Sequence, residues 1–128
     1  MSEPIWLDAA DCISFQSKLL AWSGGSDGIR DEGLLESALA RPRQRHAYGS
    51  PTLFELGAAY AFGIVKNHPF IDGNKRTGFL AAPLFLEING ERFAASEEEV
   101  VVQTVALAAG ECSEEEYASW LEQACQAQ

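Results

Sequence analysis

The stretch that organises this chain is HPFIDGNKRTG, residues 68–78. A long apolar run comes before it, and a second apolar run begins after it at Phe79. Because Pro69 disfavours helix at the residue before it, we expect His68 in an extended loop at the end of the first run. The pair Gly73-Asn74 permits a sharp turn into the second run. The stretch therefore predicts two helices joined by a short loop.

The side chains of this loop predict an anion site, most simply a phosphate site. The first turn of a helix presents unpaired N–H groups and the positive end of the helix dipole, and Lys75 and Arg76 add two positive charges. Asp72 stands just before this turn, where a carboxylate can hold a divalent cation against phosphate oxygens. His68 is near enough to accept a proton from an attacking hydroxyl.

Each of these residues also has a purely structural explanation. Asp72 alone would more often be a helix N-cap, His68 alone an ordinary loop histidine, and the two cations a solvated face. Their occurrence together within nine residues favours the functional interpretation.

Residues 68–76, HPFIDGNKR, resemble the signature H-x-F-x-[DE]-[GA]-N-[GK]-R of the Fic/Doc family at every fixed position. Lys75 is typical of Doc-type members, whereas Fic-type AMP transferases usually have Gly there; Gly73 is the more Fic-like choice. Residues 28–42 and 86–90 are also similar to Doc proteins. The resemblance covers nearly the whole chain.

This resemblance implies a kinase that transfers a phosphoryl group from ATP to a protein hydroxyl. His68 would take the hydroxyl proton, and Asp72 would hold Mg²⁺. Asn74, the amides after Gly73, Lys75 and Arg76 would hold the phosphate chain. In Doc-type toxins the implied target is a threonine of elongation factor Tu, and the implied outcome is arrest of translation.

Two other functions stay open. One is AMP transfer by the same residues with the nucleotide reversed, which His68-Pro69 and Gly73 favour and Lys75 disfavours. The other is a catalytically idle module that binds an anion or a partner helix, against which the intact His68, Asp72 and Asn74 argue.

We expect the activity of this chain to be inhibited by a separate protein. Many Fic proteins inhibit themselves with a helix bearing [ST]-x-x-x-E-[GN], and this chain has no such segment, because its Glu32-Gly33 pair has Gly28 where Ser or Thr is required. We therefore expect a small antitoxin whose disordered tail folds as an amphipathic helix into a groove of this domain. Acidic residues in that tail would suit the cationic part of the chain.

Composition limits the class of protein. The 128 residues, 47% hydrophobic and 22% charged, suit one soluble domain spanning residues 1–128. The N-terminus has no basic region, and no apolar run approaches the length of a bilayer span, so we expect a cytoplasmic protein. Three cysteines without C-x-x-C spacing favour free thiols over a disulfide framework or a zinc site.

The net charge of −10 is unevenly distributed. Seven of the nine bases lie between Arg30 and Arg76, whereas ten acids and one base follow from Glu87 onward. This balance disfavours direct nucleic-acid binding by a broad basic face and favours a local cationic site in an acidic body.

Apolar periodicity and capping residues predict an all-α fold of about six helices. Asp8, Asp31, Ser50, Ser96 and Ser113 are the expected N-caps. The expected helices span residues 9–22, 32–40, 51–67, 77–87, 97–109 and 114–124.

The polar segment 41–50 has no period, and Pro42 should end the helix before it, so we expect a surface loop there. By resemblance to Fic-type enzymes, this loop would lie over the active site as a flap. Arg30, Asp31 and Glu36 are expected to fix local structure rather than to contact substrate.

Overall fold

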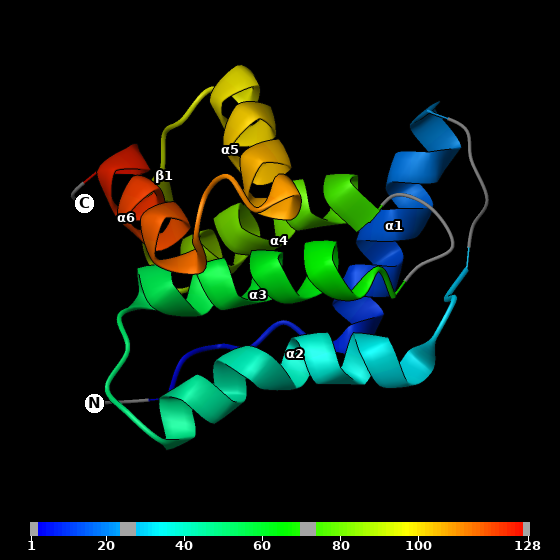
Figure 1. The fold of residues 1–128 in the computed structure, drawn as a ribbon, viewed down its shortest axis with the longest axis horizontal. Coiled ribbons are helices and arrows are strands. Elements are labelled where there is room, and N and C mark those ends of the chain that lie inside the picture. Colours follow the sequence, from blue (N-terminus) through cyan, green and yellow to red (C-terminus); the bar gives the residue numbers. More distant parts are fainter. Residues whose placement is uncertain (1–2, 24–27, 70–73, 127–128) are drawn as a thin grey trace.

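A computed structural model of the chain describes residues 3–23, 28–69 and 74–126. These residues form the predicted all-α fold (Figure 1). The helices are α1 (Ala9–Ser23), α2 (Glu32–Ala47), α3 (Leu53–Asn67), α4 (Asn74–Ile88), α5 (Glu97–Ala109) and α6 (Glu114–Ala124). Two short strands, β1 (Arg92–Phe93) and β2 (Cys125–Gln126), pair antiparallel and join the connection between α4 and α5 to the C-terminal end of α6.

Helix α3 lies at the centre of the fold, as its almost wholly apolar sequence predicts. Residues 56–65 are buried, with Phe62 half-buried among them. Helices α2, α4 and α6 all pack along α3, and Figure 1 shows it between α2 on one side and α5 and α6 on the other. The N-terminal segment is anchored to this core, because the Tyr60 hydroxyl accepts from the Leu7 amide and donates to the Leu7 carbonyl.

Two glycines allow α3 to approach its neighbours closely. A Cβ atom at Gly63 would lie 3.0 Å from the Cα of Ala38 and 3.1 Å from its carbonyl oxygen, so α2 passes directly over this position. A Cβ atom at Gly78 would lie 2.7 Å from Val65 Cγ1, so α4 comes equally close on another side. Helices α2 and α4 are therefore both tightly packed against α3.

Helix α2 contradicts the predicted end at Pro42 and the predicted loop at 41–50. It continues through Pro42 to Ala47, and Pro42 is buried. The cost of the missing hydrogen bond is offset by tertiary contacts on both sides of the proline. Arg41 forms an ion pair with Glu114, and Arg45 bonds to Glu114 at 2.7 Å and to Glu55 at 3.2 Å. The basic side chains of this segment thus tie α2 to α6 and α3, which leaves no support for the flap interpretation.

The predicted helix starts are confirmed except at α3 and at α4, which begins at Asn74. Asp31, Ser96 and Ser113 accept from backbone amides three residues ahead, and the Asp8 carboxylate accepts from the Asp11 amide. Helix α3 instead begins after Thr52, which forms a reciprocal capping box with Glu55. That box satisfies two backbone donors at once, which Ser50 followed by Pro51 cannot do.

Two further properties follow from the described residues. None of their helices has both the length and the apolar character needed to cross a bilayer. The three cysteines are free thiols, as expected from their spacing. Burial raises the pKa of Cys12 to about 12 and also raises the pKa values of Cys112 and Cys125, so none of them supplies a thiolate nucleophile near neutral pH.

Candidate active site

His68 stands at the C-terminal end of α3 with its side chain exposed. Its amide still donates to the Ile64 carbonyl, so the residue is fastened directly to the last turn of the helix. The backbone is left-handed, with φ 49° and ψ 56°, rather than extended as predicted. Pro69 disfavours the right-handed helical conformation here, and the surroundings select the left-handed one instead of the extended one. Among the described residues, His68 is the one non-glycine residue with a positive φ.

Main-chain carbonyls around His68 are held by the segment that leads into α2. The Arg30 guanidinium donates from Nε to the His68 carbonyl at 2.8 Å and from Nη2 to the Asn67 carbonyl at 2.9 Å. The amides of Arg30 and Asp31 both donate to the Pro69 carbonyl, at 2.7 and 3.1 Å. Arg30 and Asp31 therefore have the structural role expected from the sequence, and Asp31 also caps α2.

Two side chains near the end of α3 add contacts that sequence reasoning missed. The Asn67 amide donates to the Leu34 carbonyl of α2 at 3.0 Å. On another side, the Lys66 ammonium donates to the Ala108 carbonyl near the end of α5 at 3.1 Å. The polar pair Lys66-Asn67 at the end of an apolar helix could have indicated such contacts. The partners, Leu34 and Ala108, are far away in the sequence and could not be read from it. His68 is thus presented from a helix end fixed to both α2 and α5.

The other half of the predicted site is the start of α4. This helix begins at Asn74, three residues earlier than predicted, and Asn74 is half-buried. Lys75 and Arg76 therefore lie in its first turn, where backbone N–H groups and the helix dipole favour an anion. The placement of Phe70, Asp72 and Gly73, and of the Lys75 and Arg76 side chains, lies outside the described part of the structure.

Close packing brings the two halves of the site to the same end of the molecule. Gly78 in α4 lies against Val65 in α3, and Thr77 beside it is fully buried. The end of α3 and the start of α4 are consequently neighbours, joined by residues 68–73. An exposed imidazole and a helix N-terminus with two cationic residues can together bind an anion and move a proton beside it.

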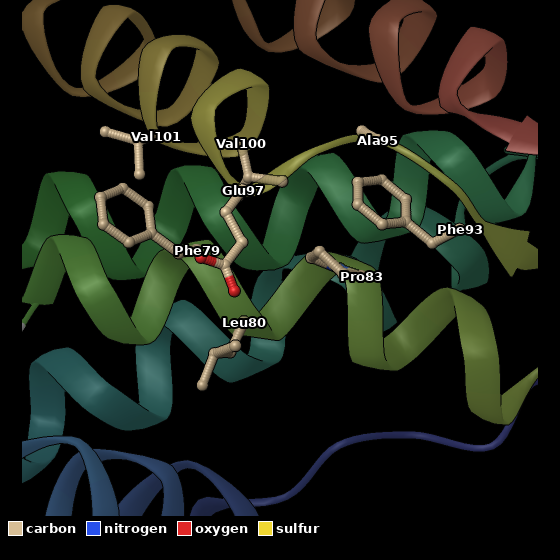
Figure 2. Close-up of a pocket in the computed structure, with 8 residues that line it drawn as sticks. All are labelled: Phe79, Leu80, Pro83, Phe93, Ala95, Glu97, Val100 and Val101. Carbon is tan, nitrogen blue, oxygen red and sulfur yellow. The ribbon is translucent and has the colours of Figure 1, made fainter. Parts of the chain in front are cut away.

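An apolar groove lies beside this end of α4. Its volume is about 430 Å³, and Figure 2 shows the rings of Phe79 and Phe93 at its two sides, with Pro83 between them and Glu97 reaching from α5 toward α4. Val101 on α5 and Leu80 on α4 also line it, and each is about two-fifths exposed. Phe79 follows the predicted site by three residues, so the groove adjoins the site along α4.

Residues 6–86 match the Fic/DOC family. This span includes α1 to α3, the whole 68–78 stretch and most of α4. The chain belongs to the Fic/DOC family. It is 47% identical over 93 residues to the protein named Toxin Doc of Mycolicibacterium smegmatis, an alignment that covers 70% of this chain and 68% of that protein. It is also 39% identical over 104 residues to the Protein kinase doc of Escherichia phage P1, covering 80% of this chain and 82% of the phage protein.

Membership in the Fic/DOC family confirms the resemblance inferred from residues 68–76. The family match includes every residue predicted for the site, from His68 to Arg76, together with the Arg30 segment that holds the end of α3. Helices α5 and α6 lie beyond the matched span. The Val101 side of the groove is therefore contributed by a part of the chain outside the family match.

Proposed function

We propose that this Fic/DOC protein transfers the γ-phosphoryl group of ATP to a serine or threonine hydroxyl of a target protein. The observation that carries the proposal is the pairing of an exposed His68, fixed at the end of α3, with the N-terminus of α4. The 39% identity to a phage protein named a protein kinase supports phosphoryl transfer over other uses of the same site.

In this reaction the target hydroxyl oxygen forms a bond to the γ-phosphorus, and the bond from that phosphorus to the bridging oxygen breaks to release ADP. His68 accepts the hydroxyl proton. The amides after Gly73, the Asn74 side chain and the cations of Lys75 and Arg76 orient and neutralise the phosphate chain. Catalysis is then mainly positioning and electrostatic stabilisation, as is usual for phosphoryl transfer.

Asp72 is the residue that would hold Mg²⁺. Within the described residues there is no group of three His, Cys, Asp or Glu side chains suited to a metal. A site with one carboxylate completed by substrate phosphates suits Mg²⁺, which seldom occupies an all-protein cage. When bound, the ion would neutralise charge on the phosphate oxygens. In the sequence Asp72 precedes the first residue of α4 by two positions, and we propose that its carboxylate meets those oxygens through the ion.

Isotope position distinguishes the proposal from AMP transfer, which His68-Pro69 and Gly73 favour. Purified protein is incubated with a host lysate and ATP labelled either at the α or at the γ phosphate, with His68→Ala as the control. Label in protein from γ-labelled ATP alone is the expected result. Label from α-labelled ATP would show AMP transfer. Equal labelling by the His68→Ala variant would contradict the assignment of His68 as the general base.

Elongation factor Tu is the target we propose, with translation arrest as the consequence. The support is the resemblance to Doc-type toxins and the 47% identity to a protein named Toxin Doc. Adding purified elongation factor Tu to the γ-label assay, followed by mass spectrometry, tests this choice. A phosphothreonine in the factor would support it, and labelling of other lysate proteins alone would contradict it.

We also propose an antitoxin whose disordered tail folds as an amphipathic helix in the groove between α4 and α5. The groove suits apolar anchors, and a basic residue of the tail would complement Glu97. Acidic residues are less favoured than the sequence suggested, since Arg41 and Arg45 are paired with Glu114 and Glu55.

Co-expression tests this docking surface. The intact chain alone should be toxic to its host, and the adjacent open reading frame should relieve the toxicity. Val101→Asp in the groove should abolish this relief, whereas Val102→Asp, one residue along and outside the groove lining, should keep it. Harmless expression of the intact chain alone would contradict the toxin proposal. Equal relief of both variants would contradict binding of the antitoxin tail in this groove.

A further inference from the structure

The conformation of His68 is unfavourable for a residue with a side chain, so something in the fold must hold it. A left-handed backbone is populated mainly by glycine, because the Cβ atom of other residues crowds the following carbonyl. His68 has φ 49° and ψ 56°. Strained conformations of this kind persist only where the surroundings determine them, and they concentrate at functional sites.

Arg30 contacts the two peptide groups that define this conformation. The Asn67 carbonyl belongs to the peptide plane before His68, whose orientation sets φ, and the His68 carbonyl belongs to the plane after it, whose orientation sets ψ. The guanidinium donates to both, at 2.9 and 2.8 Å. One planar guanidinium thus contacts the peptide groups on both sides of the candidate general base.

The segment that carries Arg30 is itself fixed by further hydrogen bonds at the start of α2. Its own amide and that of Asp31 donate to the Pro69 carbonyl, while the Asp31 carboxylate caps α2 through the Leu34 amide. Carbonyls at a helix C-terminus have no partner within the helix, and here three consecutive ones, at residues 67–69, are satisfied by Arg30 and Asp31. The start of α2 is consequently the frame against which the end of α3 is fixed.

We propose that Arg30 is the positioning residue of His68: by bridging the carbonyls of Asn67 and His68 it sets the direction in which the imidazole faces the substrate hydroxyl. It acts through the main chain and touches neither substrate nor phosphate. The inference rests on the proposed function, because it assigns a role to the orientation of His68. Lysine cannot replace the fork of the guanidinium, since a single ammonium nitrogen cannot reproduce its two fixed donor directions.

The test compares Arg30→Ala and Arg30→Lys with Arg45→Ala. The control also removes an arginine that bridges two elements, but at the opposite end of α3. The chain has only two histidines, His46 and His68, so the imidazole signals in a proton NMR spectrum can be assigned with one His68→Asn variant. Thermal melting, KM for ATP and the single-turnover rate of phosphoryl transfer are measured for each protein.

We expect Arg30→Ala to shift or broaden the His68 signals, leave the His46 signals in place and lower the transfer rate by about 10- to 100-fold, since misplacing a catalytic group costs rates of this order. KM for ATP should change little. Arg30→Lys should fall between Arg30→Ala and the wild type. Arg45→Ala should keep the wild-type His68 signals and transfer rate, whatever its melting temperature.

The proposal is overturned if Arg30→Ala keeps the wild-type His68 signals, or if its rate falls only in proportion to its unfolded fraction. Should Arg30→Ala not fold, the same criteria apply to Arg30→Lys. Absence of phosphoryl transfer in the wild type would refute the proposed function, and the NMR comparison would still decide whether Arg30 holds His68.

Discussion

At its N-terminal end, helix α3 is joined to its neighbours by ion pairs between side chains, whereas at its C-terminal end it is joined by hydrogen bonds to main-chain carbonyls. Arg45 bridges Glu55 of α3 and Glu114 of α6. Arg30 instead donates to the carbonyls of Asn67 and His68. The same residue type is used in both places, but its partners differ.

The difference concerns what each contact determines. An ion pair between two long side chains fixes the distance between helices while leaving their backbones free to adjust. A guanidinium bound to successive carbonyls fixes backbone dihedral angles. The first arrangement stabilises packing around the Glu114 carboxylate, whose side chain is only 11% exposed. The second presents the exposed His68 side chain in one direction, as a catalytic group requires.

The largest expected effect is at the C-terminal end. His68→Ala should lower the transfer rate by about 10²- to 10⁴-fold, the usual contribution of a general base, while the free energy of unfolding changes little because the side chain is exposed. Single-turnover kinetics and a urea titration measure the two quantities. Full activity in this variant would remove His68 from the mechanism.

A substitution in the middle of α3 should mainly lower the stability of the protein. Gly63→Ala should lower the free energy of unfolding by about 1–3 kcal/mol, because the new methyl group overlaps the backbone of Ala38 and α2 must move. Gly57→Ala is the matched control: its Cβ would meet only side-chain atoms at 3.5 Å or more, and alanine is the better helix former. Equal destabilisation of both variants would show that close packing against α2 is not the cause.

At the N-terminal end, Glu114→Gln should lower the free energy of unfolding by about 1–2 kcal/mol, since Arg41 and Arg45 lose the charge that they share. The transfer rate per folded molecule should stay the same. Glu115→Gln, an exposed neighbour in the same turn, should be nearly neutral in both respects. A selective loss of activity in Glu114→Gln would mean that the two ends of α3 are coupled.

Alkaline pH should lower the free energy of unfolding by a smaller amount than these substitutions do, through buried thiol and phenol groups of the core. Burial raises the pKa of Cys12, Tyr60 and Tyr117 to about 12. The unfolded chain releases these protons first, so stability is complete near neutral pH, begins to fall as the pH approaches 9 and declines further as the pH rises toward 12. At pH 9 the loss from Cys12 is about half a kcal/mol. Melting curves between pH 7 and 10 measure it, and Cys12→Ala should show the shallower decline; identical curves would contradict the assignment.

Local signals sufficed for several elements. The bounds of α5 and α6 agree with prediction because Ser96 and Ser113 cap their helices through residues three positions ahead. The start of α3 was missed because two local signals compete, and the capping box of Thr52 and Glu55 prevails over Ser50 and Pro51. Glu55 also receives Arg45 from α2, a contact that no local pattern contains.

The sequence by itself determined the family, the all-α fold and the combination of imidazole, carboxylate and cations within residues 68–76. These depend on residue type, periodicity and short spacings. Tertiary structure alone decided that α2 runs through Pro42 and that His68 is left-handed. In both places a local preference competes with contacts from remote residues. Arg30 is 38 positions from His68 in the chain, so only the folded packing of α2 beside α3 brings its guanidinium to the carbonyls that it holds.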